Sequence, residues 1–377
     1  MIELRDVLKI YTGMAEPAVD HLSFKVPAGE TCVLIGPSGC GKTTTLKMVN
    51  RLVEPTSGEI LVDNADILQQ DPVQLRRHIG YVIQQVGLFP HMSVRDNIAT
   101  VPRLLEWKRP QIDARVDELL AMVGMEPASY RSRYPRELSG GQQQRVGVAR
   151  ALAADPPVML MDEPFGAIDP IARDHLQNEF LRLQEQIKKT ILFVTHDIDE
   201  ALKMGTIIGI LRKGGTLAQF DAPAQILANP ADPFVAAFVG ADRGLKQLSL
   251  VRVRDLIHRD IELALPGESA EAVIGKIRKA KVDSILLVDD EGKLLGSVSL
   301  DALQAGPGET AGELSQPVSV TTEEESTMKD AFSQMLTSGM SYMPVLGEKR
   351  KLLGIVTARD AQRFIETGTV HSGPGNC

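Results

Sequence analysis

Residues 36–43 of the chain read Gly36-Pro37-Ser38-Gly39-Cys40-Gly41-Lys42-Thr43, directly after the apolar run of residues 31–35. The order of strand, glycine-rich turn and helical stretch is the P-loop pattern, in which backbone N–H groups curl around phosphate oxygens. In this pattern Lys42 supplies a cation to the β- and γ-phosphates, and the Thr43 hydroxyl ligates Mg²⁺. We therefore predict that residues 36–43 and the adjacent Thr44 bind the phosphates of a nucleotide, with Mg²⁺ as cofactor.

Two further apolar runs end in polar residues that suit the same chemistry. Residues 158–161 lead into Asp162 and Glu163, and residues 191–194 lead into His196 after one threonine. Because ligands of open α/β sheets bind at the carboxyl ends of the parallel strands, we expect these side chains to meet the P-loop. Asp162 would hold Mg²⁺ through water, Glu163 would polarise the attacking water as general base, and His196 would contact the γ-phosphate.

Composition places the chain among soluble globular proteins of more than one domain. It has 377 residues, of which 43% are hydrophobic and 24% charged, and no apolar run approaches the roughly 20 residues of a membrane helix. The first ten residues lack the long apolar core of a signal peptide, so we expect a cytoplasmic protein that is at most peripheral to a membrane. The formal net charge of −8 argues against nucleic acid as a partner. Cys32, Cys40 and Cys377 are expected to be free thiols.

The patterns along the chain predict an α/β fold with three parts in its first domain. The apolar runs that precede the polar residues above indicate a core of parallel strands. Residues 58–62, followed by Asp63-Asn64, predict a strand and a tight turn in a small antiparallel section. Residues 102–135 are helical in pattern, with apolar positions at i, i+3, i+4 and i+7 from Val116 and with Gly124 closing that helix. This part is expected to be a helical insert.

An internal repeat follows a polar segment at residues 240–247. Lys-Leu-Leu-Gly occurs from Lys293 and again from Lys351, each time after an apolar strand and an amphipathic helix. Thr322 and Glu325 are expected to form the capping box that starts the helix of the second copy. The sequence thus predicts domains at residues 1–240, 250–308 and 312–370, the last two being small helix-strand-strand-helix units.

Residues 138–142, Leu-Ser-Gly-Gly-Gln, identify the first part more narrowly. They match the ABC signature motif, and with it residues 1–238 resemble the ATPase subunit of ABC transporters, whose fold is a P-loop ABC ATPase domain. The resemblance also identifies Gln84 with the Q-loop, Asp169 with the D-loop and Tyr11 with the aromatic that stacks on adenine. It implies that ATP is the nucleotide. The catalytic residues would be Lys42, Gln84, Glu163 and His196, and the residues that bind Mg²⁺ would be Thr43, Gln84 and Asp162. The further residues in contact with nucleotide would be Tyr11, Ser139, Gly140, Gly141, Gln142 and Asp169.

A closer resemblance concerns the cargo and the partners. Residues 43–52, 79–90, 142–147 and 164–170 resemble the ATPases of importers for glycine betaine, carnitine, choline or proline betaine. The resemblance implies a dimer, most simply of two copies, with each ATP held between the P-loop of one chain and Ser139–Gln142 of the other. It further implies separate permease subunits in the membrane, contacted through the Q-loop and the helical insert, a solute-binding protein that acts through the permease, and a location at the cytoplasmic face of the bacterial inner membrane.

The repeated C-terminal unit resembles a tandem CBS module. Thr357 and Asp360 fit the CBS ribose-phosphate pattern, whereas the first copy displaces its acid by one position, to Asp301. Two regulatory hypotheses stay open: an adenine-type nucleotide such as a cyclic dinucleotide at Thr357 and Asp360, or weak binding of anionic lipid that responds to ionic strength. The second rests on four cations of one helix, whose attraction salt would screen, namely Lys276, Arg278, Lys279 and Lys281.

Two other functions compete with osmoprotectant import. One is an ABC importer for another small solute, such as an amino acid, with the CBS pair as a general regulator. The other is an ABC ATPase that acts on nucleic acid rather than in transport; such proteins usually carry long coiled coils or two cassettes, whereas this chain has one cassette and an acidic balance.

Overall fold

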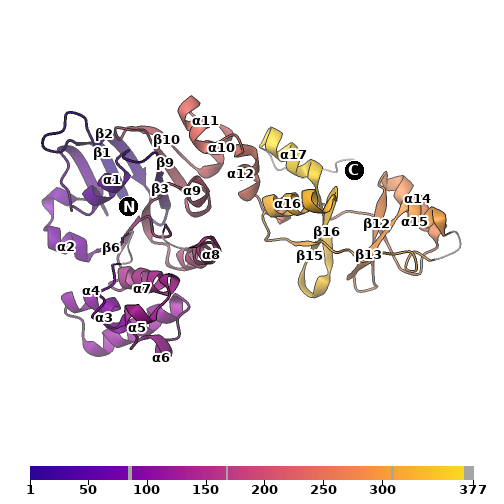
Figure 1. Ribbon diagram of the computed structural model, residues 1–377, viewed down its shortest axis with the longest axis horizontal. Helices are drawn as coiled ribbons and strands as arrows, with labels where there is room; N and C mark the ends of the chain where they lie inside the picture. Colours follow the sequence, from indigo (N-terminus) through magenta and orange to yellow (C-terminus); the bar gives the residue numbers. More distant parts are fainter. Residues whose placement is uncertain (84–86, 167–168, 307–309, 369–377) are drawn as a thin grey trace. The chain divides into compact units, whose positions relative to one another are not determined.

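The computed structural model describes residues 1–83, 87–166, 169–306 and 310–368. The chain divides into two compact units, Met1–Gly240 and Ala241–Cys377 (Figure 1). The predicted Q-loop residue Gln84 and the final Cys377 lie outside the described residues. Each unit is treated by itself below.

A six-stranded sheet forms the centre of the first unit, in the order β10-β9-β3-β8-β7-β6. Only β10, at one edge, is antiparallel to its neighbour. Val194 at the end of β8 pairs with Leu34 of β3 and with Asp162 of β7, so these three strands end at the same level. The strands are β3 (Thr31–Ile35), β6 (Ile79–Val82), β7 (Val158–Asp162), β8 (Thr190–Val194), β9 (Ile207–Leu211) and β10 (Leu217–Asp221).

A second sheet, of four antiparallel strands, has the order β2-β1-β4-β5. It consists of β1 (Ile2–Lys9), β2 (Val19–Val26), β4 (Ser57–Val62) and β5 (Ala65–Asp66). Asp63 and Asn64 join β4 to β5 with φ values of 52° and 64°, as a two-residue hairpin turn with right-handed strand twist requires. The predicted strand and turn of the antiparallel section are confirmed.

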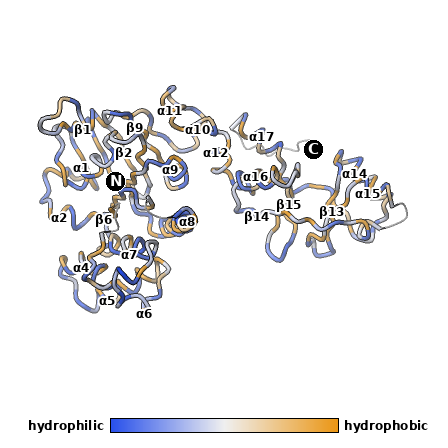
Figure 2. The backbone as a smooth tube through the Cα atoms, in the orientation of Figure 1, coloured by the Kyte–Doolittle hydropathy of each residue, from blue (hydrophilic) through white to orange (hydrophobic). Residues whose placement is uncertain are grey.

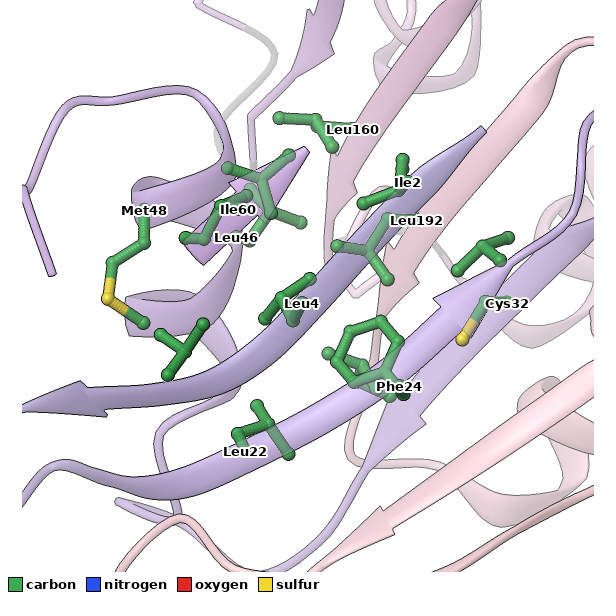
Figure 3. Packing of buried hydrophobic residues seen from close by; sticks show 14 of the residues in the cluster. Ile2, Leu4, Leu22, Phe24, Cys32, Leu46, Met48, Ile60, Leu160 and Leu192 are labelled. Carbon is green, nitrogen blue, oxygen red and sulfur yellow. The ribbon is translucent and has the colours of Figure 1, made fainter. Parts of the chain in front are cut away.

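Apolar side chains of the two sheets and of helix α1 (Lys42–Val49) form one core. In Figure 3, side chains of β1 and β2 face those of α1 and of the central strands. Figure 2 colours the backbone by hydropathy. Hydrophobic stretches lie on the strands of the central sheet, and hydrophilic stretches lie at their ends. Burial of this surface stabilises the position of α1, and therefore of the P-loop before it.

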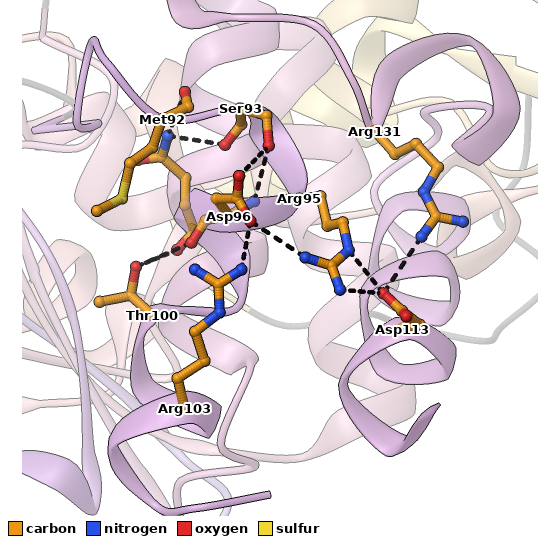
Figure 4. Close-up of polar contacts among 9 residues, drawn as sticks. Met92, Ser93, Arg95, Asp96, Thr100, Arg103, Asp113 and Arg131 are labelled. Atoms are coloured by element: carbon orange, nitrogen blue, oxygen red, sulfur yellow. Dashed lines mark hydrogen bonds and ion pairs between the residues drawn. The ribbon is translucent and has the colours of Figure 1, made fainter. Parts of the chain in front are cut away.

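The helices of the insert extend beyond the predicted residues 102–135 on both sides, from α3 to α7, and carry an ion-pair network. Asp113 accepts hydrogen bonds from Arg95 (2.6 Å) and Arg131 (3.3 Å), and Asp96 binds Arg95 and Arg103 (Figure 4). Gly124 follows the longest of these helices, as predicted, with φ 69°. The helices are α3 (Val94–Ile98), α4 (Thr100–Leu104), α5 (Arg109–Met122), α6 (Pro127–Tyr130) and α7 (Gly140–Leu152).

The remaining helices of the first unit flank the central sheet. They are α2 (Pro72–Arg77), α8 (Pro170–Ile187), α9 (Ile198–Met204), α10 (Pro223–Ala228) and α11 (Pro233–Val239), with single 3₁₀ turns at Ile67–Gln69 and Pro135–Glu137. The long α8 begins after β7, and α9 begins directly after β8. Both helices therefore start at the edge of the sheet where the predicted site residues emerge.

The second unit contains the two repeats, each built on a three-stranded sheet. After α12 (Arg243–Ser249) and α13 (Val253–Leu256), the first repeat comprises β11 (Leu263–Ala264), α14 (Ala270–Ala280), β12 (Ser284–Val288), β13 (Leu294–Ser299) and α15 (Leu300–Ala305). The second comprises β14 (Thr322–Glu323), α16 (Met328–Ser338), β15 (Tyr342–Leu346), a 3₁₀ turn at Glu348–Arg350, β16 (Leu352–Thr357) and α17 (Ala358–Thr367).

Equivalent positions of the two repeats meet each other. Ser284 and Tyr342, 58 residues apart, share a hydrogen bond of 2.9 Å between their hydroxyls. The two lysines that open the repeated Lys-Leu-Leu-Gly segments, Lys293 and Lys351, form a β-bridge. An approximate twofold axis therefore relates the repeats, and the predicted internal repeat is a structural one.

One helix start was predicted wrongly. Helix α16 begins after Thr327, whose Oγ1 accepts a hydrogen bond from the backbone N–H of Asp330 at 3.1 Å. Thr322 instead lies in β14 and pairs with Val345 of β15. The sequence offers two threonines five residues apart, and strand pairing, a tertiary effect, decides between them. The polar segment at residues 240–247 also holds more structure than its composition indicates, because α12 begins at Arg243.

Candidate functional site: the phosphate edge of the central sheet

The P-loop connects β3 to α1 by a backbone that only glycine permits at its first position. Gly36 has φ 152°, and a Cβ there would lie 2.4 Å from the carbonyl oxygen of Leu211. The loop closes with a hydrogen bond from the backbone N–H of Cys40 to Pro37 O at 3.2 Å. The N-terminus of α1, which favours anions, therefore opens directly behind the loop.

Lys42 is buried, and its ammonium is held by the loop itself. Nζ donates to the carbonyl oxygens of Gly36 (2.7 Å) and Pro37 (3.1 Å), and the residue is 7% exposed. Neutral carbonyls are weaker acceptors for an ammonium than an anion is. A phosphate in the loop would therefore be the stronger partner for this cation.

Thr43, in the first turn of α1, contacts Asp162, the last residue of β7. The Thr43 hydroxyl donates to Asp162 Oδ1 at 3.1 Å. Burial raises the pKa of the Asp162 carboxyl, and the nearby charge of Glu163 adds to this rise, whereas the Thr43 hydrogen bond opposes it. A hydroxyl and a carboxylate whose negative charge is poorly compensated form an oxygen donor set that suits Mg²⁺.

The donor set is too small to hold a metal without other ligands. Among the described residues, no group of three or more His, Cys, Asp or Glu side chains is arranged for a metal ion. Mg²⁺ commonly uses one or two protein oxygens and completes its octahedron with water and substrate phosphates. Thr43 and Asp162 therefore fit a cation that arrives with a nucleotide.

Glu163 and His196 face each other across the ends of β7 and β8. His196 Nδ1 lies 3.1 Å from Glu163 Oε1, and the two side chains are 67% and 21% exposed, respectively. Glu163 has φ 46°, an uncommon conformation for a non-glycine residue, and its backbone N–H donates to Val194 O at 2.9 Å. Such backbone strain is often found at functional residues.

Tyr11 lies next to the P-loop, whereas the signature residues lie in another part of the first unit. The Tyr11 hydroxyl is 3.5 Å from Thr44 Oγ1, and the residue is 37% exposed, so it remains accessible to a ligand. Ser139 caps α7: its Oγ accepts from the Gln142 backbone N–H (3.3 Å), and Gln142 Oε1 accepts from the Ser139 N–H (3.0 Å).

The structure thus brings together some of the predicted site residues and separates others. Lys42, Thr43, Asp162, Glu163 and His196 gather at one edge of the central sheet. Residues 139–142 belong to α7 and its cap, which Figure 1 shows among the helices of the insert. Asp169 caps α8 by accepting from the Ala172 N–H at 3.0 Å.

Sequence reasoning missed two residues that support the site. Asn97, fully buried, accepts from the Phe89 N–H (2.7 Å) and donates toward three carbonyls of residues 89–93, so it fixes the segment that follows the Q-loop position. Burial and the charge of Asp162 raise the pKa of Tyr81, on β6, to about 12. A lone Asn or Tyr carries no motif, so neither could have been found from the sequence.

The second unit holds its own polar cluster at the start of α17. Asp360 Oδ2 accepts hydrogen bonds from the Thr357 backbone N–H (2.9 Å) and hydroxyl (2.6 Å), and it lies 2.9 Å from His258 Nε2. His258 is held in place by two backbone hydrogen bonds with Ile355, of 2.8 and 2.9 Å. The histidine was not predicted, because it lies about one hundred residues away in sequence.

The first repeat lacks this cluster. Ser299 caps α15 as Thr357 caps α17, with its Oγ accepting from Ala302 N–H at 3.2 Å. Ala302 stands where the second repeat has Asp360, and Gln316, which bridges to Ser297, stands where the other has His258. The second repeat therefore places its carboxylate, Asp360, one position further into the helix than the first repeat places Asp301.

The cations predicted to attract lipid are partly used inside the fold. Lys276 Nζ binds Glu268 at 2.7 Å and Leu263 O at 2.8 Å, and Lys279 binds Glu262 at 2.8 Å. These two ammonium groups are already partnered by carboxylates of their own repeat, which weakens the case for a lipid-binding face.

Comparison with known proteins agrees with these observations. A family model described as "ABC transporter" matches residues 19–166, and one described as "CBS domain" matches residues 253–304 and 311–367. The glycine betaine/carnitine/choline transport ATP-binding protein OpuCA of Bacillus subtilis is 46% identical over 360 residues, covering 95% of this chain and 94% of the relative. The osmoprotectant import ATP-binding protein OsmV of Salmonella typhimurium is 44% identical, covering 98% and 97%.

A solved structure resembles the first unit. It is the dimeric post-hydrolysis state of the ATP-binding cassette MJ0796 bound to ADP and Pi, which is 34% identical and aligns with a TM-score of 0.53. The alignment covers 59% of this chain and 99% of that cassette.

The fold and the site define an ABC ATPase cassette joined to a pair of CBS repeats, as predicted. The chain belongs to the ATP-binding subunits of ABC importers for osmoprotectants, with relatives of about its own length. It is therefore an ATPase coupled to transport. No helix in the described part of the chain is long and apolar enough to cross a membrane.

Proposed function

We propose that this chain binds Mg²⁺·ATP at the edge formed by β3, β7 and β8, and hydrolyses it to drive import of a quaternary-ammonium osmoprotectant such as glycine betaine. The observation that carries the proposal is the convergence of a buried Lys42, the Thr43–Asp162 pair and the Glu163–His196 pair at the ends of three aligned strands. Relatives named for glycine betaine, carnitine and choline transport support the cargo.

Each of these side chains has a distinct part in the proposal. Lys42 binds the β- and γ-phosphates, while Thr43 and Asp162, with Gln84, hold Mg²⁺, which neutralises charge on the phosphates when bound. Glu163 accepts a proton from the attacking water, and His196 orients the γ-phosphate and the carboxylate of Glu163. Tyr11 stacks on adenine, and Gly36–Thr44 surround the phosphates.

The site is completed by a second copy of the chain. Helix α7 begins at Gly140, after the N-cap Ser139. The backbone N–H groups at such a helix start favour an anion. In the proposed dimer Ser139 to Gln142 close over ATP held by the opposite P-loop, and Asp169 lies at the same junction. The dimeric cassette among the structural relatives supports this arrangement.

The other partners follow from the division of labour in an importer. We place the dimer at the cytoplasmic face of the bacterial inner membrane, with the Gln84 segment and the helical insert against separate permease subunits. A solute-binding protein would deliver the cargo to the permease. The domain boundaries proposed for this assembly are residues 1–240 for the ATPase and 250–308 and 312–370 for the CBS repeats.

Uptake in cells tests the cargo. A strain that lacks this gene would receive the wild-type gene or Glu163→Gln, and uptake of labelled glycine betaine, carnitine, choline, proline and one amino acid would be measured at low and high osmolarity. We expect the wild type alone to restore uptake of at least one quaternary ammonium compound. Restoration of amino-acid uptake alone would replace the cargo and leave the ATPase assignment standing.

For the second unit, the cluster of Thr357, Asp360 and His258 favours regulation by a nucleotide over lipid binding. The hydrogen bonds of the cluster are made by Asp360 Oδ2, so Oδ1 can accept one from a ribose hydroxyl. The N-terminus of α17 favours a phosphate, because its backbone N–H groups attract anions. Calorimetry of the full chain with adenine nucleotides, including cyclic dinucleotides, should show saturable heat. Saturable binding to anionic vesicles without any nucleotide heat would favour the lipid hypothesis instead.

A further inference from the structure

A buried carboxylic acid lies behind the site and takes no part in the chemistry described above. Glu200 on α9 is 7% exposed and Gln177 on α8 is 5% exposed. The side-chain amide of Gln177 donates to Glu200 Oε1 at 3.0 Å. A buried charged or polar group is costly unless it is hydrogen-bonded, so this pair is a specific arrangement rather than a surface accident.

The segment around His196 is tied to Glu200 through the neighbouring residues. Thr195, 2% exposed, accepts a hydrogen bond at its hydroxyl oxygen from the backbone N–H of Asp197 at 3.1 Å. The side chain of Asp197 in turn accepts from the backbone N–H of Glu200 at 3.2 Å. The two residues on either side of His196 are therefore linked to each other and to the residue that carries the buried carboxyl.

The His196 side chain is largely exposed. It is 67% exposed, and within the part of the chain that the structure describes its hydrogen-bonding contact is with Glu163. The position of the imidazole therefore depends on the backbone of residues 195–197. Burial raises the pKa of Glu200, a rise that the Thr195 and Gln177 hydrogen bonds oppose; Asp197 and Arg173 are the charged groups nearby.

We propose that Glu200 is a positioning residue, which with Gln177 anchors the His196 segment to α8 in the arrangement that hydrolysis requires. Asp169, the residue proposed to lie at the dimer junction, is the N-cap of α8, and Asp197, which follows His196, is the N-cap of α9. The Gln177–Glu200 contact is thus a polar link between the two helices that begin at the γ-phosphate site and at the junction. The inference rests on the proposed role of His196.

The test is ATPase kinetics of the full chain with four variants. Glu200→Met keeps the length of the side chain and removes both acceptors; we expect kcat to fall about 10- to 100-fold, the effect of a displaced catalytic group, with the Kd for ATP within about twofold of wild type. Glu200→Gln keeps an oxygen acceptor for the Gln177 amide and should retain at least about a third of the wild-type kcat. Glu185→Met, at an exposed position of α8, is the matched control and should behave as wild type.

The fourth variant, His196→Ala, separates the two levels of the proposal. If His196→Ala hydrolyses ATP normally, the proposed function of His196 fails, whatever Glu200 does. If His196→Ala is inactive but Glu200→Met keeps its kcat, the positioning role alone is overturned. A Glu200→Met protein that loses ATP affinity and melting temperature together with kcat, and is not rescued by Gln, would show a general structural role and would also overturn it.

Discussion

The two units of the chain treat their site residues in opposite ways. In the ATPase unit, the Lys42 ammonium donates to neutral carbonyls, and among the described residues one hydroxyl donates to the buried Asp162 carboxylate. In the CBS unit, a single oxygen of Asp360 receives two donors from Thr357 and one from His258. The first site has charges that a ligand can satisfy better than the protein does, whereas the second is largely satisfied already.

This difference predicts how strongly each site should respond to change. A group that exchanges weak partners for strong ones on binding contributes much to affinity, while a group that must first give up good hydrogen bonds contributes little. Substitutions in the ATPase unit should therefore have large effects on chemistry. Those at the CBS cluster should have modest effects on binding.

The largest effect is expected for Glu163→Gln. Loss of the general base should lower ATP turnover by about 10² to 10⁴-fold, while ATP binding is retained because the phosphate contacts are unchanged. Steady-state ATPase assays and equilibrium binding of labelled ATP would measure the two quantities. Glu185→Gln, an exposed glutamate of α8, serves as the control. Near-normal turnover in Glu163→Gln would remove Glu163 from the mechanism.

A backbone substitution extends the comparison to stability. Gly354 has φ 154°, and a Cβ there would lie 2.2 Å from the carbonyl oxygen of His258. Gly354→Ala should therefore destabilise the CBS unit by at least about 1–3 kcal/mol through overpacking and backbone strain. Because His258 must move, nucleotide binding at Asp360 should weaken as well, while basal ATP hydrolysis at the other unit should persist.

Denaturant unfolding followed with a probe in the CBS unit would measure this change. Gly275→Ala is the matched control, since a Cβ at Gly275 meets nothing within 4 Å and the position lies inside α14. Alanine is the better helix former by about 0.5–1 kcal/mol, so this control should be neutral or stabilising. Equal destabilisation by both variants would show that the close approach at Gly354 is unimportant.

Much of the ATPase unit could be predicted from the sequence, because the candidate site residues belong to short local motifs. The P-loop, Asp162-Glu163 and Thr195-His196 each follow an apolar strand, and strand order alone brings them together. The partners that hold these residues in place could not be predicted. Gln177 meets Glu200 only because α8 and α9 pack side by side, and no short-range pattern encodes that contact.

In the CBS unit the same limit is more severe. Thr357 and Asp360 share one helix start and were predicted, but His258 reaches them from the segment between α13 and β11, about one hundred residues earlier. The mistaken helix start at Thr322 has the same origin, since pairing with Val345 of β15 decides the structure of that residue. Candidate helix caps can be predicted from the sequence, whereas contacts between distant segments depend on the packed fold.

A difference between the two repeats gives a smaller effect. Asp360→Asn should weaken nucleotide binding to the full chain about tenfold, the effect of one lost hydrogen bond to a charged group. Asp301→Asn, the displaced acid of the first repeat, should leave affinity and stoichiometry unchanged. Calorimetry that shows one site per chain, sensitive to Asp360 alone, would support the asymmetry. Two equal sites, or equal sensitivity to Asp301, would contradict it.

The smallest expected effect concerns the charge on Asp162. Because burial raises the pKa of this carboxyl, the folded state binds its proton more tightly than the unfolded state does, so the ionised carboxylate opposes folding at pH values above the raised pKa. Asp162→Asn removes that charge. At neutral pH without nucleotide the variant should melt about 2–4 °C higher, the shift that roughly 1 kcal/mol gives in a unit of this size.

The pH dependence distinguishes this cause from a change in packing. As the pH falls through the raised pKa, Asp162 of the wild type becomes neutral too, so the advantage of Asp162→Asn should shrink toward zero. Asp63→Asn, in an exposed turn, provides the control and should show no such trend. With Mg²⁺·ATP present the order should reverse, because the cation compensates the wild-type carboxylate and the variant offers it no charge. A gain in the variant that is independent of both pH and Mg²⁺ would mean that the charge of Asp162 is already compensated within the protein.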